Sequence, residues 1–184
     1  TGQTSEELVV LSDQAKELGS STQFTAIQVL GLQTELAKLG FTVKDIENST
    51  PAILDLAASL EVDLASAAEF AGSVVRSFGL TTEETQRVVD VMALSTSSSA
   101  LNFEALRESL KLVAPTSRAT GVSIEKTAAL LWVLANNGLK GSVAGTGLSK
   151  TFIELNKKGL TREEGMSKVL KELLVLREQL LKSV

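Results

Sequence analysis

Four nearly identical tripeptides recur at even intervals along this chain of 184 residues. Each joins a glycine, an apolar residue and a serine or threonine, with an acidic residue close behind; the glycines are Gly40, Gly79, Gly121 and Gly159. Glycine readily takes the left-handed conformation just past a helix end. Serine and threonine cap the next helix, whose first turn favours acidic residues. The pattern therefore predicts helix–turn–helix joints. Intervals of 39, 42 and 38 residues (79−40, 121−79, 159−121) leave room for two helices each.

The composition restricts the core to aliphatic side chains. Hydrophobic residues make up 43% of the chain but aromatic residues only 4%, so leucine, alanine, valine and isoleucine must fill the interior. Two prolines leave long helical stretches uninterrupted. We therefore expect an all-α, compact multi-helix domain of about eight to ten short helices rather than one rod-like helix.

Local signals place the helix boundaries. Gly19 is expected to end the first helix, and a short helix is expected after Thr42. Thr50-Pro51 is interpreted as the start of a separate helix, because proline fits the first helical turn. The serine- and threonine-rich run Ser95–Ser99 is interpreted as a loop.

Further along, Asn102 and Ser123 are predicted helix caps, as is Asp63 earlier in the chain. Pro115 is expected to bend or end the helix that contains it. The most apolar helix, Thr127–Ala135, is expected to be buried at the centre, because it is apolar on all sides.

The end of the chain carries a leucine-rich stripe on a predicted helix from Arg162 to Lys182. Spacings of 3, 4, 3 and 4 form a heptad pattern, widened by further leucines; the stripe contains Met166, Val169, Leu173, Leu176 and Leu180, and the widening residues are Leu170, Leu174 and Leu181. We therefore divide the chain into a helical core, 1–160, and an amphipathic C-terminal helix, 161–184. This helix either docks on the core or pairs as a coiled coil with a second copy, and the pattern leaves both open.

The composition argues against several classes of function. A net charge of −4 with dispersed signs disfavours direct nucleic-acid binding. The absence of histidine and cysteine removes the commonest general base, the thiolate nucleophile and the usual transition-metal ligands. The longest apolar run, Ala128–Ala135, is too short to cross a membrane. We expect no enzyme activity, no catalytic residue, no cofactor and no metal. Thr1, which is not methionine, is interpreted as an internal position of a longer protein.

Two motifs superficially suggest chemistry. Ser123-Ile124-Glu125-Lys126 matches a serine acyl-transfer pattern, but the same residues form a helix cap and first turn. Gly145-Thr146-Gly147 suggests a phosphate loop, but Ser149 precedes Lys150 where glycine is required, and no strand precedes the segment. We interpret these small residues as sites where helix backbones approach closely.

Several ordered fragments between Leu32 and Leu155 resemble the core region of the tail tape measure proteins of long-tailed bacteriophages and prophages. The resemblance is carried by Leu36–Thr42, Leu56–Ala58, Asp63–Glu69, Ser77–Leu80, Val89–Ala93, Val113–Pro115, Gly121–Glu125 and Thr127–Ala129. It is clearest at Leu134–Thr146, which is similar to the family signature LANxGIKGSxAGT. The signature residues are Asn136, Asn137, Gly138, Lys140, Gly141, Ala144, Gly145 and Thr146. The family usually has an arginine soon afterwards, where this chain has Ser149-Lys150.

The resemblance implies a structural virion protein that takes part in tail assembly, tail-length determination and genome delivery. It implies contacts with the tail tube protein, tail assembly chaperones and tail-tip proteins. It also implies a location in the virion tail, and in the host bacterial cytoplasm during assembly. The alternative from the repeat spacing is a helical-repeat adaptor that binds a partner protein in a groove.

Overall fold

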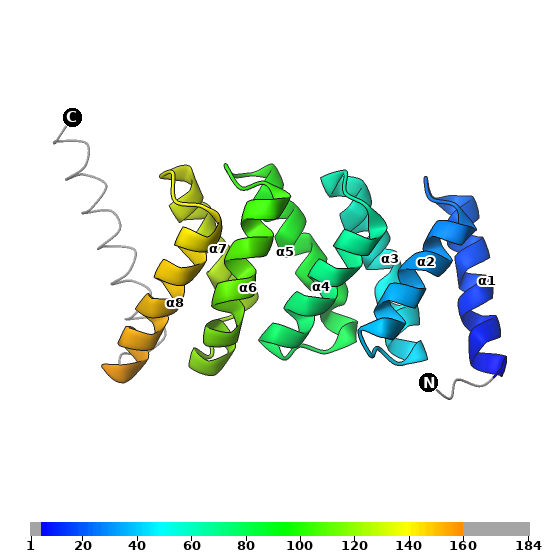
Figure 1. Ribbon diagram of the computed structural model, residues 1–184, viewed down its shortest axis with the longest axis horizontal. Coiled ribbons are helices and arrows are strands. Elements are labelled where there is room, and N and C mark those ends of the chain that lie inside the picture. Colours follow the sequence, from blue (N-terminus) through cyan, green and yellow to red (C-terminus); the bar gives the residue numbers. More distant parts are fainter. Residues whose placement is uncertain (1–4, 160–184) are drawn as a thin grey trace. The chain divides into compact units, whose positions relative to one another are not determined.

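The computed structural model describes residues 5–159, and over this range the chain is helical, with no strand. Figure 1 shows the elements, which are α1 Ser5–Ser21, α2 Ala26–Lys38, α3 Val43–Leu60, α4 Leu64–Phe78, the 3-10 helix η1 Thr82–Glu84, α5 Thr85–Ser97, α6 Phe103–Thr120, α7 Ile124–Asn136 and α8 Gly141–Lys157. The all-α prediction and the expected number of helices are confirmed. The helix predicted at 162–182 lies outside the described residues, so the boundary at 160/161 stays a prediction.

The chain divides into two compact units, 1–97 and 98–184, a boundary that the sequence analysis did not place. Unit 1 contains α1 to α5, and the described part of unit 2 contains α6 to α8. Among the described residues, no helix is both long and apolar enough to span a membrane.

The four predicted joints follow α2, α4, α6 and α8, so each interval holds two helices as expected. All four glycines have positive φ, from +62° at Gly159 to +80° at Gly40. After α2, α4 and α6, the residue beyond the glycine donates its N–H to a carbonyl five residues back, as in Phe41 to Leu36 at 3.1 Å. These bonds satisfy carbonyls that the helix end leaves without partners.

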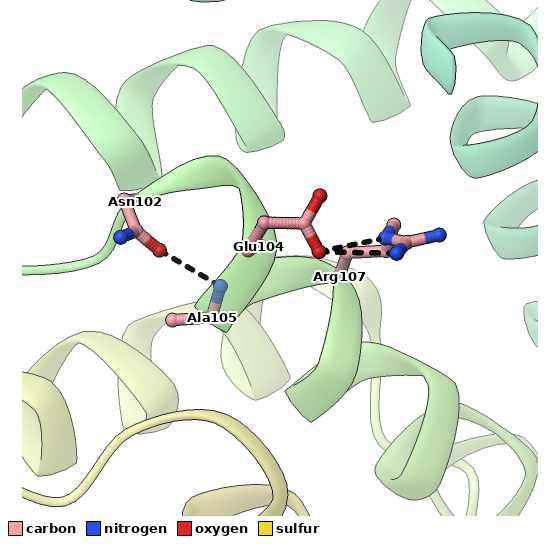
Figure 2. Close-up of polar contacts among 4 residues, drawn as sticks. All are labelled: Asn102, Glu104, Ala105 and Arg107. Atoms are coloured by element: carbon pink, nitrogen blue, oxygen red, sulfur yellow. Dashed lines mark hydrogen bonds and ion pairs between the residues drawn. The ribbon is translucent and has the colours of Figure 1, made fainter. Parts of the chain in front are cut away.

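The predicted caps are also present. Asp63 Oδ1 accepts a hydrogen bond from the Ser66 N–H at 2.9 Å, and Ser123 Oγ accepts one from the Lys126 N–H at 3.4 Å. Figure 2 shows the start of α6, where Asn102 Oδ1 accepts the Ala105 N–H at 2.8 Å.

Within unit 1, α3 is the central helix, because it packs against α1, α2, α4 and α5. The prediction of two helices here is wrong, since α3 runs unbroken through Pro51. Proline cannot donate to the carbonyl four residues earlier, which belongs to Glu47. The Gln14 side chain of α1 supplies the missing donor, with Nε2 2.8 Å from the Glu47 oxygen. Gln14 Oε1 also accepts a 3.0 Å bond from buried Gln33 of α2, so one side chain links three helices.

Hydroxyl groups connect α3 to η1 and α5. Asp45 forms a capping box with Thr42, because the N–H and the hydroxyl of Thr42 both donate to Asp45 Oδ2. The other carboxylate oxygen, Asp45 Oδ1, accepts a hydrogen bond from the Thr82 hydroxyl at 2.6 Å. Deeper in the unit, the hydroxyls of Ser49 and Thr85 lie 3.1 Å apart. Hydrogen bonding to Thr42, and then to Thr82, lowers the pKa of the Asp45 carboxyl below its ordinary value of 3.8.

Two other local predictions in unit 1 are wrong. Gly19 lies inside α1 instead of ending it, and an added Cβ would lie 2.4 Å from the Ala26 backbone nitrogen, so glycine allows the turn into α2 to pass close by. The predicted loop Ser95–Ser99 is wrong for its first three residues, which belong to α5, where the Ser95 hydroxyl donates to the Val91 carbonyl at 2.6 Å. Such internal bonds let serine remain in a helix. Ser98 and Ser99 lie beyond the helix as predicted.

Unit 2 is organised around α6, which packs most extensively against α8 and also contacts α7. Figure 1 shows α6 and α8 side by side. Pro115 does not end α6, which continues to Thr120. The prediction of a fully buried central helix is wrong for α7: Leu131 is buried, but Trp132 is 41% exposed.

Replacing Gln14 with methionine should lower the free energy of unfolding by about 1–2 kcal/mol, because the Glu47 carbonyl and the Gln33 amide both lose a partner. Urea unfolding followed by circular dichroism measures the change. Gln86→Met, at an exposed position of α5, is the control. Equal stability of the two variants would contradict the linking role of Gln14.

The Asp45 carboxylate should make stability depend on pH. Because its folded pKa lies below the unfolded value, it stabilises the fold above about pH 4, and that contribution is lost as the pH falls through the folded pKa. Asp45→Asn should melt at a lower temperature than the parent at pH 7, and the difference should shrink towards pH 2. Melting curves across this range test the prediction, with Asp55→Asn, exposed on the same helix, as control. A constant difference at all pH values would contradict it.

Candidate functional site

The family-signature segment forms the turn between α7 and α8 and the first half of α8. Asn137 caps the end of α7, and Gly138 has φ +85°. The next residue, Leu139, donates its N–H to the Leu134 carbonyl at 2.9 Å, which closes the helix end.

The two signature asparagines hold this turn in place. Asn136 Oδ1 accepts the N–H of Ala100 at 2.9 Å, so it connects the end of α7 to the segment that leads into α6. Asn137 Nδ2 donates to the Val133 carbonyl at 2.7 Å, within the last turn of α7. Both side chains are therefore used by the fold.

The small residues of the signature bring α8 against the backbone of α6. A Cβ added to Gly145 would lie 2.6 Å from the Ser109 carbonyl oxygen and 2.9 Å from its Cα, closer than side chains can approach. Gly141 has φ +58°, and a Cβ there would lie 2.6 Å from Glu108 Oε2. Ala144 is buried beside them. This confirms the interpretation of the glycine-rich segment as a close helix contact, and it places that segment in a helix instead of a phosphate-binding loop.

Polar bonds fix the register of this contact. The Ser109 hydroxyl donates to the Gly141 carbonyl at 2.9 Å in a buried position, although it also lies 2.7 Å from the Ala105 carbonyl. Two turns further along, the hydroxyls of Thr116 and Ser149 lie 2.7 Å apart. Ser149 thus has a packing role, and Lys150 beside it is exposed.

Five signature residues are exposed to solvent, and the other three, Gly141, Ala144 and Gly145, are buried. Among the exposed five, the side chains of Asn136 and Asn137 are held by hydrogen bonds, and Gly138 has no side chain. Lys140 precedes α8 with an extended backbone, and Thr146 lies on the exposed side of α8. Lys140 and Thr146 are therefore the exposed signature side chains that the fold itself does not use.

The role of Ser109, the α6 residue that meets the α8 glycines, was not predicted from the sequence. Ser109 is fully buried, in line with Leu106, Leu110 and Val113. A serine at helical spacing within an apolar stripe was the available signal. At the start of the same helix, Arg107 and Glu104 pair at 3.0 Å on the surface (Figure 2), where an ion pair contributes little to stability.

Among the described residues, no group of three or more acidic residues is placed to hold a metal ion. Ser123, the residue of the acyl-transfer pattern, caps α7 through its hydroxyl oxygen. The site is thus a helix–helix contact with a short exposed edge.

Comparisons with known proteins give a consistent result. The family of phage-related minor tail proteins matches residues 12–180. The chain is 38% identical over 147 residues to the tape measure protein of Pneumococcus phage Dp-1, covering 80% of this chain and 13% of that protein. It is 32% identical over 143 residues to a probable tape measure protein of Escherichia phage P2, covering 78% and 18%. The chain therefore spans less than a fifth of either relative. No solved structure matches it.

The contact at Gly145 can be tested by a matched pair of glycine-to-alanine substitutions inside helices. Gly145→Ala forces a methyl group against the Ser109 backbone and should cost about 1–3 kcal/mol of unfolding free energy. Gly31→Ala in α2 meets no atom of the described residues within 4 Å and should be neutral or stabilising by up to about 1 kcal/mol, because alanine favours helix over glycine. Chemical denaturation of both variants measures the difference. If Gly145→Ala is as stable as Gly31→Ala, the close approach of α6 and α8 is wrong.

Proposed function

Because the chain belongs to the family of phage-related minor tail proteins, we propose that it is a folded segment of a tail tape measure protein. As such it serves tail assembly, tail-length determination and genome delivery, and has a structural role without catalysis. The observation that carries this proposal is the match of residues 12–180 to the family. The helical-repeat adaptor is not favoured, because both relatives described above are named as tape measure proteins of phages.

The partners follow from the same assignment. The tail tube protein, tail assembly chaperones and tail-tip proteins are the proposed contacts, and the exposed edge at Lys140 and Thr146 is the proposed contact point within the signature. The protein resides in the virion tail and, during assembly, in the host cytoplasm. Peptidoglycan cleavage by the purified chain would overturn the non-catalytic role.

Within the full-length protein, this segment acts as a folded assembly module and contributes little length to the ruler. Capped turns interrupt the helices at intervals throughout residues 5–159, and each unit is compact by itself. If the same residues were instead opened into one helix inside the tube, they would span roughly 230 Å at about 1.5 Å per residue.

An in-frame deletion of residues 5–159 from the full-length protein separates these roles. We expect few or malformed tails, with any complete tails of unchanged length, as measured by electron microscopy of phage lysates. Gly31→Ala, at an open position of α2, is the control and should give normal tails. Complete tails shortened by roughly 230 Å would show that the segment is part of the ruler. Infectious particles with normal tails would contradict the proposed assembly role.

A further inference from the structure

An apolar pocket of about 180 Å³ opens between the end of α7 and the first half of α8. Its lining is aliphatic apart from one threonine: Leu134, Leu139, Val143, Ala144, Gly147, Leu148 and Thr151. Val143 is 65% exposed and Leu139 43% exposed, so large apolar side chains at the rim contact water. Val143, Gly147 and Thr151 follow one another at four-residue spacing, which places them on one face of α8. The face of α8 that meets α6 is a different one, at Gly141 and Gly145.

The turn at the end of α8 has the geometry of the earlier joints. Gly159 has φ +62°, and its N–H bonds to the Asn156 carbonyl at 3.1 Å, as the N–H groups of Gly40, Gly79 and Gly121 do three residues back. At those three joints the next helix packs against the one before it: α3 contacts α2, α5 contacts α4, and α7 contacts α6. Leu160-Thr161 repeats the apolar and hydroxyl residues of the other joints. By analogy, we expect the segment after Gly159 to fold back against α8.

We propose that the leucine stripe of residues 162–182 docks into this pocket within the same chain. Gly147 lies twelve residues before the turn at Gly159 (159−147), so an antiparallel helix of equal rise brings a residue near position 171 opposite it. The stripe places Leu170, Leu173 and Leu174 at that height. No atom of the described residues lies within 4 Å of the Cβ position of Gly147, so its missing side chain leaves space for a leucine. This proposal does not depend on the proposed function.

Cysteine cross-linking in the 184-residue chain tests the docking, because the sequence contains no cysteine. Gly147→Cys is combined in turn with Leu170→Cys, Leu173→Cys and Leu174→Cys, and each protein is oxidised at low concentration. A disulfide requires the two Cβ atoms within about 4.5 Å. At least one pair should therefore form an intrachain disulfide, seen by non-reducing electrophoresis and mass spectrometry.

Two controls make the result specific. Glu172→Cys paired with Gly147→Cys stands at nearly the same height on the opposite face of the predicted helix, and should cross-link roughly tenfold less than the best leucine position. Gly31→Cys, at an open position of α2, replaces Gly147→Cys as a partner outside the pocket. Circular dichroism checks that each variant stays helical. If Gly147→Cys unfolds, Val143→Cys takes its place.

Three outcomes would overturn the proposal. Cross-linking at Glu172 equal to that at all three leucines would mean that the leucine face does not enter the pocket. Disulfides that join two chains would mean that a second copy occupies the pocket, as the coiled-coil alternative requires. The absence of any disulfide in helical variants would mean that the pocket is not filled by this segment.

Discussion

Satisfying the backbone at each helix end is the constraint on which the rest of the structure depends. Eight helices within residues 5–159 leave many N–H and C=O groups without partners inside their own helices. At the joints after α2, α4 and α6, a left-handed glycine and the residue beyond it satisfy the carbonyls, and a hydroxyl residue begins the next element. This chemistry also brings neighbouring helices together, because the helix after each of these joints packs against the one before it.

Small side chains then determine how closely the helices approach. The chain has few aromatic residues, so bulky groups do not hold the helices apart. At Gly145 the α8 helix meets the α6 backbone, and the buried Ser109 hydroxyl bonds to the first residue of α8. Close backbone contact of this kind depends on shape and tolerates little change. The segment that makes this contact, Asn136–Thr146, is accordingly composed mostly of asparagine, glycine and alanine.

Polar side chains bridge the helices in both units. In unit 1, Gln14 joins α1, α2 and α3, and Asp45 connects the start of α3 to η1. In unit 2, pairs of hydroxyl groups bridge helices, as at Thr116 and Ser149, and at Ser117 and Thr127, 3.0 Å apart. Each bridge is formed between residues well separated in sequence. The hydroxyl residues that appear neutral in the sequence therefore specify which helices pair.

The sequence by itself determined the helical class, the four joints, the main caps and the resemblance to tape measure proteins, because caps and turns depend on residues only a few positions apart. The tertiary structure alone decided the continuity of α3 through Pro51, since the donor for the Glu47 carbonyl comes from Gln14, 33 residues away. It likewise decided that Gly19 lies inside α1, close to Ala26 of α2, and that Trp132 on α7 is exposed. The partner of the signature glycines, Ser109 of α6, was also set by packing. Local signals cannot identify such partners, because burial and long-range hydrogen bonds arise only when distant helices meet.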